Sequence, residues 1–160
     1  MPTIELDTKI KADVQLCFDL SRSIELHLLS TKRTREEAIA GVTSGLIGLE
    51  ESVTWEAKHF GFRQRLTSKI TAMESPFYFR DEQTRGIFKK LVHDHYFRQE
   101  NGLTIMRDHF LFEAPFGLIG KYFSKIVLTN YLRKFLTERN NLIKQYAERG
   151  HADFLPRKPD

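Results

Sequence analysis

The sequence predicts an α+β fold in which an antiparallel sheet of about seven strands curves around a long C-terminal helix. Two patterns lead to this prediction. Between about residues 35 and 113, apolar and polar residues alternate with a period of two, and turns recur at short intervals. From about residue 118 to residue 148, apolar residues recur at helical spacing instead. At 160 residues, the chain is about the size of one domain with its own core.

The N-terminal region is expected to contribute one strand and two short helices. Residues 3–10 alternate in the manner of a strand. Asp13 is a suitable N-cap for the next helix, because its short carboxylate can accept hydrogen bonds from the first free amides. Apolar residues between 14 and 29 have mixed helical spacing, which indicates two helices that break near Ser21 to Ser23.

The remaining strands and the long helix define the expected architecture. A sheet with one apolar face needs a cover, and the helix at 118–148 is the only predicted element large enough to supply it. If the sheet curls around this helix, the space between them is a cavity. We take residues 1–149 as the domain and residues 150–160 as a C-terminal tail. The links between the strands are short, so the strands are expected to form an antiparallel meander at residues 35–42, 51–60, 62–73, 77–85, 88–99 and 103–114.

Composition and charge restrict the function classes. The single cysteine, Cys17, excludes an intramolecular disulfide, and no secretory signal pattern is present, so a cytoplasmic location is expected. No apolar run is long enough to span a membrane, which leaves only peripheral membrane contact. The net charge of +4 is spread along the chain without a nucleic-acid-binding motif, so no nucleic acid is expected as a partner. The oligomeric state stays open.

A tight hairpin is predicted at Asn101-Gly102, because Asn-Gly readily adopts the positive φ angles of a two-residue turn. In the register that this turn sets, His95 faces Asp108 across the two strands. Because this face is more apolar than the other, it is expected to face the helix, and Asp94 is expected to point away. The alternation of side chains places eight residues on the inner face: Leu91, His93, His95, Phe97, Met106, Asp108, Phe110 and Phe112.

His93, His95 and Asp108 are the polar residues of this inner face, and three interpretations of them are open. His95 and Asp108 can form a structural pair in which two buried polar groups satisfy each other. The three side chains can hold a metal with one open position. His95 can act as a general acid or base that Asp108 orients. His-x-His on a strand is a weak metal motif and no nucleophile stands beside it, so we favour the structural pair and expect no metal and no cofactor.

Two other predicted strands add residues to the expected cavity wall. Trp55 shares one side of its strand with other apolar residues. Phe77, Phe79, Asp81 and Gln83 share one face, so inward-facing phenylalanines would bring two polar groups into an apolar chamber. Such a chamber is the usual composition of a small-molecule site.

Four segments stand out: GLEESVTW (48–55), FRDEQ (79–83) followed by Gly86 and Phe88, HDHYF (93–97), and MRDHFLFEAPFGLIG (106–120). Together with the order of the predicted elements, they resemble the START-like superfamily, also called SRPBCC or helix-grip. The resemblance covers about residues 3–148. Within the superfamily, these segments are similar to a bacterial stand-alone branch whose members are often labelled cyclase/dehydrase-like. The resemblance implies a helix-grip fold around a hydrophobic ligand cavity. Members of the superfamily include both ligand-binding proteins and enzymes, and they share no common set of catalytic residues. Gln83, His93, His95 and Asp108 match recurring positions of the branch.

The sequence therefore predicts a binding protein for a hydrophobic or amphipathic small molecule, such as a lipid, a quinone or a polyketide-like compound. His93, His95, Asp108 and Gln83 are expected to orient a polar head. The expected apolar wall consists of Trp55, Phe79, Phe97, Met106, Phe110, Phe112, Phe123 and Val127. One alternative is a cyclase, dehydratase or hydrolase that uses His95 and Asp108 in the same cavity. Another alternative is an interaction protein that docks a partner through its tail or through the apolar loop at 41–49. If this loop does not bind a partner, it is either a simple connection between strands or a mobile lid over the cavity.

Overall fold

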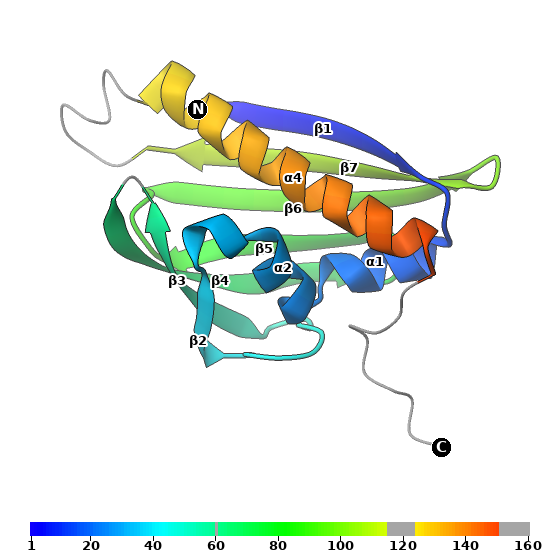
Figure 1. The fold of residues 1–160 in the computed structure, drawn as a ribbon, viewed down its shortest axis with the longest axis horizontal. Coiled ribbons are helices and arrows are strands. Elements are labelled where there is room, and N and C mark those ends of the chain that lie inside the picture. The colour runs from blue at the N-terminus through cyan, green and yellow to red at the C-terminus, as the bar shows by residue number, and fades with distance from the viewer. Residues whose placement is uncertain (60, 115–123, 151–160) are drawn as a thin grey trace.

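A computed structural model describes residues 1–59, 61–114 and 124–150 of the protein, and Figure 1 shows a curved sheet with helices on its concave side. The sheet is antiparallel throughout, with the order β1-β7-β6-β5-β4-β3-β2. The N-terminal strand therefore pairs with the last strand of the meander. The seven strands are β1 (Thr3–Ile10), β2 (Glu37–Gly41), β3 (Ser52–His59), β4 (Phe62–Glu74), β5 (Tyr78–Arg85), β6 (Lys90–Glu100) and β7 (Leu103–Glu113).

The helices cover the concave face. α1 (Val14–Ser21) and α2 (Ile24–Ser30) follow β1, and a short 3₁₀ turn, η1 (Lys32–Thr34), leads into β2. A π-helical turn, η2 (Ser124–Leu128), opens directly into α4 (Thr129–Glu148), which crosses the sheet. The predicted fold class is confirmed. The predicted start of the long helix, at residue 118, lies outside the described residues.

Local sequence signals account for the N-terminal elements. Asp13 caps α1, because its side chain accepts hydrogen bonds from the backbone amides of Gln15 and Leu16. Ser23 caps α2 in the same way through the amide of Leu26. The predicted break near Ser21 to Ser23 is therefore confirmed, and it is fixed by a second cap.

The loop at 41–49 is anchored to this break. Ile47 is buried, its amide donates to the carbonyl of Arg22, and the amide of Gly45 donates to the Glu25 carboxylate. The isolated bridge between Ser23 and Leu46 adds a further contact. These contacts attach residues 45–47 to the start of α2, and Ile47 is part of the cavity wall, so they favour a structural connection over the lid interpretation.

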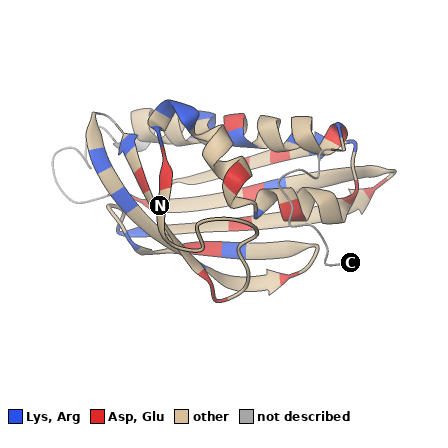
Figure 2. Ribbon diagram, turned by 60° about the horizontal axis from the view of Figure 1, so that its bottom comes forward, with Lys and Arg blue, Asp and Glu red and all other residues tan. Residues whose placement is uncertain are grey.

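The core consists of two apolar clusters on the concave face. One surrounds Phe18 of α1 and includes Phe97, Met106 and Ile143. The other surrounds Phe112 and includes Leu136 of α4. Among the described residues, no helix combines the length and apolarity needed to cross a membrane. Figure 2 shows basic and acidic residues interspersed over the described elements rather than separated onto opposite faces.

Candidate functional site

A cavity of about 660 Å³ lies between the concave face of the sheet and the helices. Its volume is in the usual range for small-molecule sites, about 300–1,000 Å³. Phe62 and Ile87 line it and are also exposed at the surface, with 72% and 39% of their surface accessible, so the cavity reaches the surface near the β3–β4 and β5–β6 turns. Most of the wall is apolar, and it includes Ile24, Val53, Ala57, Leu66, Ile70, Leu91, Leu128, Leu132, Phe135 and Leu136.

The hairpin of β6 and β7 supplies one side of the cavity. Its register is the predicted one: His95 pairs with Asp108, and His93 with Phe110. Asp94 points to the convex face as expected, yet it is buried there beneath Tyr78 and Arg80, which both donate hydrogen bonds to it. The inner face therefore carries two histidines and one aspartate between apolar residues.

A polar layer separates the two apolar clusters, and it consists of Asp81, His93, His95, Asp108, Arg139 and Asn140. Along β6 the inner residues run from an apolar residue through the two histidines to an apolar residue again, and along β7 Asp108 occupies the same level. On α4, Arg139 and Asn140 lie between Leu136 of one cluster and Ile143 of the other. β6, β7 and α4 therefore all contribute polar side chains at the same position on the concave face, between the two apolar clusters.

The hydrogen bonds in this layer correct the expected His95–Asp108 pair. His93 Nε2 is 2.7 Å from Asp108 Oδ1, whereas His95 Nε2 is 2.7 Å from Asp81 Oδ2 on the opposite neighbouring strand. His95 Nδ1 is 3.4 Å from Asp108 Oδ1, and the geometry of that contact is not that of a hydrogen bond. The two imidazoles pack with their ring centroids 3.7 Å apart and their planes at 35°, and each ring is hydrogen-bonded to a different carboxylate.

Electrostatics keep both carboxylates ionised. Burial alone would raise the pKa of Asp108, but the hydrogen bond with His93 and the charge interactions with His93 and His95 hold that pKa well below its usual value. Burial opposes ionisation of Asp81 too, and the hydrogen bond with His95 together with the charge of nearby His93 lowers the pKa of Asp81. The pKa of His93 is lowered, chiefly because burial disfavours the charged ring.

The long helix supports Asp108 from behind. Asn140 Nδ2 donates to Asp108 Oδ2 at 2.5 Å and to Thr8 Oγ1 at 3.3 Å. Arg139 donates to the Asn140 side chain and to the backbone carbonyl of Ser21, and it also lines the cavity. Sequence reasoning missed both residues. The available signal was their position three and four residues after Leu136, where a helical apolar stripe should continue.

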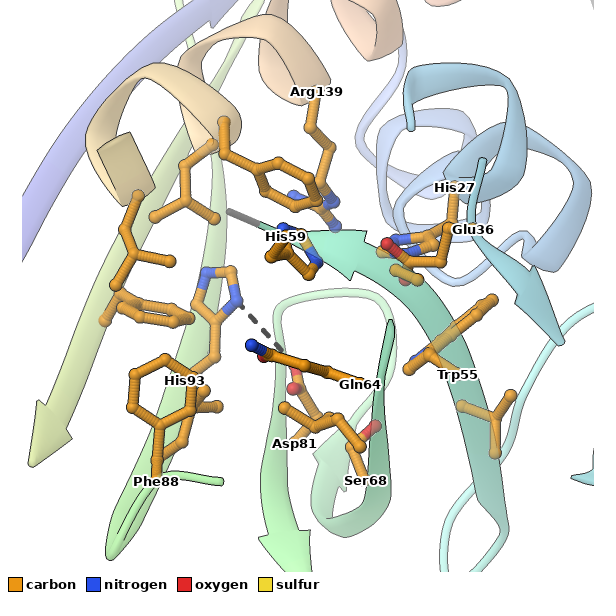
Figure 3. Close-up of a pocket in the computed structure, with 18 of the residues that line it drawn as sticks. His27, Glu36, Trp55, His59, Gln64, Ser68, Asp81, Phe88, His93 and Arg139 are labelled. Carbon is orange, nitrogen blue, oxygen red and sulfur yellow. Dashed lines mark hydrogen bonds and ion pairs between the residues drawn. The ribbon is translucent and has the colours of Figure 1, made fainter. Parts of the chain in front are cut away.

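A second polar group lies across the cavity. His27 Nε2 is 2.7 Å from Glu36 Oε1, and the His27 ring packs on Trp55 with centroids 4.1 Å apart. His59 Nδ1 is 2.6 Å from the Tyr131 hydroxyl, and burial lowers the pKa of His59. Figure 3 shows His27, Glu36 and Trp55 on one side of the cavity and His93 and Asp81 on the other, with Arg139 reaching in from α4.

Only part of the predicted wall lines the cavity. Trp55, Phe79, His93, His95 and Phe110 line it. Five other predicted residues do not line it: Gln83, Phe97, Met106, Asp108 and Phe112.

These five have identifiable partners elsewhere. Phe97 packs edge-on against Phe18, 5.5 Å between centroids, because α1 fills that end of the sheet. Met106 belongs to the same apolar cluster, and Phe112 to the other. Gln83 donates to the Phe88 carbonyl. Asp108 stands one layer behind the wall, beneath His93.

The remaining two predicted residues come from the region before α4. Val127 is 47% exposed and does not line the cavity, because it lies on the outer side of η2. Phe123 lies outside the described residues.

Comparison with solved structures establishes the fold. A protein of Thermus thermophilus is 16% identical, with a TM-score of 0.70, and the match covers 89% of this chain and 97% of that one. The Zhui aromatase/cyclase of Streptomyces sp. R1128 is 13% identical, with a TM-score of 0.70 over 97% of this chain and 99% of that one. A START superfamily protein of Mycobacterium smegmatis is 7% identical, with a TM-score of 0.69 over 93% and 99% of the two chains.

The chain has the START-like, helix-grip fold. At these identities the likeness concerns the fold alone, because one fold can carry many functions. No family model and no curated protein matches the sequence.

Proposed function

We propose that this protein binds a hydrophobic or amphipathic small molecule between the sheet and α4, as a cytoplasmic carrier or sensor. The observation that carries the proposal is the 660 Å³ cavity, whose wall is mainly apolar and has polar side chains in two groups, one around His93 and Asp81 and one around His27 and Glu36. Apolar wall supplies affinity through area removed from water, and a few placed polar groups orient the ligand. Lipids, quinones and polyketide-like compounds all combine an apolar part with a few polar groups.

The polar groups suit a head group that carries an oxygen. Arg139 lines the cavity and can donate to a carboxylate or carbonyl, while Asp81 can accept from a hydroxyl. Both side chains lie at the same level of the polar layer, so a ligand would place its head there and its apolar part toward Trp55 and Leu132. The contact with the ligand head that the sequence assigned to Gln83 and Asp108 is therefore assigned to Arg139 and Asp81.

The test uses two substitutions on neighbouring residues of β3. Ala57→Phe places a ring inside the cavity, whereas Lys58→Phe places the same ring on the convex, exposed face. Trp55 is the only tryptophan in the chain and lines the cavity, so its emission reports occupancy directly. Dodecanoic acid and dodecanol serve as probes with an anionic and a neutral head.

We expect saturable changes in Trp55 emission with wild-type protein and with Lys58→Phe, and at least about 10-fold weaker binding with Ala57→Phe, since the ring takes up apolar volume that the probe would fill. Native mass spectrometry of freshly purified protein, followed by solvent extraction, identifies any ligand carried from the cell. Absence of saturable binding by wild-type protein together with a bare mass would contradict the proposal.

A second candidate function is acid–base catalysis in the same cavity. His95 and Asp81 are 2.7 Å apart at the cavity wall, and a buried histidine held by a carboxylate is a common general acid or base. In this version Asp81 replaces Asp108 as the residue that is hydrogen-bonded to His95 and orients its ring. Turnover of a cavity ligand that disappears in His95→Gln, with binding retained, would favour this function over binding alone.

A further inference from the structure

The two histidines of β6 present their nitrogens in two directions. His93 Nε2 and His95 Nδ1 both face Asp108, at 2.7 Å and 3.4 Å from the same carboxylate oxygen. His93 Nδ1 and His95 Nε2 both face Asp81 Oδ2, at 3.8 Å and 2.7 Å. The Asp108 carboxylate therefore lies on the side of both rings away from the cavity, and the Asp81 carboxylate lies on the other side of both rings, at the cavity wall.

We propose that Asp81, His93 and His95 form a binding site for a divalent transition metal, Zn²⁺ or Fe²⁺, at the wall of the cavity. One donor atom from each residue lies within 4.8 Å of the others. Ligands at about 2.0–2.1 Å from a common metal lie about 2.9–3.4 Å from one another, and the separations of 2.7 Å and 3.8 Å from Asp81 bracket that range. Small side-chain adjustments would therefore bring the three donors around one ion.

The surrounding residues can hold the proposed metal ligands in position by hydrogen bonds, as metal sites require. A histidine that binds a metal through one nitrogen usually donates from its other nitrogen to a carboxylate, which fixes the ring. Asp108 occupies that position for both rings, and Asn140 holds Asp108 in turn by a hydrogen bond of 2.5 Å. This arrangement explains a feature that a structural pair leaves unexplained, namely why two buried imidazoles have a carboxylate on each side.

The charge of the layer also suits a cation. Two acidic side chains, Asp81 and Asp108, lie in this layer with one basic side chain, Arg139, whose Nη1 atom is 3.7 Å from Asp108 Oδ1. A buried group with a net negative charge is costly unless a cation compensates it. A metal would take the place of the present hydrogen bond between His95 Nε2 and Asp81 Oδ2.

The donor set indicates the metal class. Two imidazoles and one carboxylate with open positions are typical of catalytic zinc and of non-haem Fe²⁺, whereas Ca²⁺ and Mg²⁺ prefer oxygen donors alone. Asp81 keeps 22% of its side-chain surface accessible and lines the cavity, so the open positions would face the cavity. If the proposed ligand-binding function holds, the oxygen of the ligand head would bind there.

The experiment measures metal binding without any organic ligand, so it does not depend on the proposed function. Wild-type protein is first stripped of metal with a chelator. It is then titrated with Co²⁺, whose visible absorption reports nitrogen and oxygen donors in low-coordinate geometry. A separate titration with Zn²⁺ is followed by calorimetry. We expect one equivalent of each metal to bind. Asp81→Asn and His95→Gln should each weaken binding by at least about 100-fold, since even supporting residues contribute 10- to 100-fold to metal affinity.

Two matched controls isolate the site. His27→Gln and His59→Gln remove imidazoles that line the same cavity but belong to the other polar group, and they should leave affinity within about 2-fold of wild type. Circular dichroism confirms that each variant is folded. Wild-type protein that binds neither metal at about 100 µM would overturn the proposal, and so would one-equivalent binding that survives both Asp81→Asn and His95→Gln.

Discussion

Replacing Asp108 by asparagine tests whether the polar layer is held together by a charge. Asp108 is completely buried and accepts hydrogen bonds from His93 at 2.7 Å and from Asn140 at 2.5 Å. Asparagine has nearly the same shape, but only one of its two terminal atoms accepts. One of the two donors therefore loses its acceptor, and the nearby Arg139 loses its closest buried carboxylate.

The magnitude follows from these two losses. A hydrogen bond to a charged group contributes about 1.5–3 kcal/mol, and removal of one partner of a buried ion pair costs about 3–5 kcal/mol. Arg139 keeps its bonds to Asn140 and to the Ser21 carbonyl, so the lower end applies. We expect Asp108→Asn to lower the free energy of unfolding by about 3 kcal/mol. In a domain of this size that corresponds to a fall of roughly 6–12 °C in Tm.

The assay is urea unfolding followed by the emission of Trp55, in the presence of a chelator so that bound metal does not contribute. Two further substitutions calibrate it. Asp81→Asn should cost less, about 1 kcal/mol, because Asp81 is partly accessible and loses one hydrogen bond. Asp7→Asn, in an exposed ion pair with Arg107, should cause no resolvable change. If Asp108→Asn costs no more than Asp81→Asn, the buried charge does not hold the layer and our reasoning is wrong.

Two other predictions concern pH and capping. Burial holds the pKa of His59 below its ordinary value of 6.5, so below that pH the unfolded chain takes up a proton more readily than the folded one, and stability falls as the pH falls. Between about pH 7.5 and pH 5.5, thermal unfolding should therefore show a smaller drop in Tm for His59→Gln than for wild type, and an equal drop would contradict this account. Asp13→Ala removes the cap that bonds the amides of Gln15 and Leu16, and it should cost about 1 kcal/mol in chemical unfolding, whereas Asp13→Asn should cost much less.

Local chemistry explains why most of the fold could be predicted. The Asn101-Gly102 turn takes positive φ angles at both residues, 52° and 77°, and these angles set the register of β6 and β7. The period-two alternation then assigns each side chain of the hairpin to a face. Turn, cap and strand signals each depend on a few neighbouring residues, so they survive without knowledge of the rest of the chain.

The candidate site depended on contacts between distant segments. The alternation placed His93, His95 and Asp108 on one face, but it could not say that His95 would bond Asp81 across the other neighbouring strand. Which of two flanking carboxylates a histidine meets depends on ring tilt, and ring tilt depends on the packing of both imidazoles. A sequence pattern carries no information on that choice.

By itself the sequence determined the order of elements, the register of the last hairpin and the identity of its inner face, because periodicity and turn geometry are local properties. Only the tertiary structure decided which inner residues are cavity wall and which are core. α1 brings Phe18 against Phe97, which closes one end of the concave face. α4 brings Arg139 and Asn140 to the level of the histidines, and this distant helix joins the polar residues of three strands into one layer.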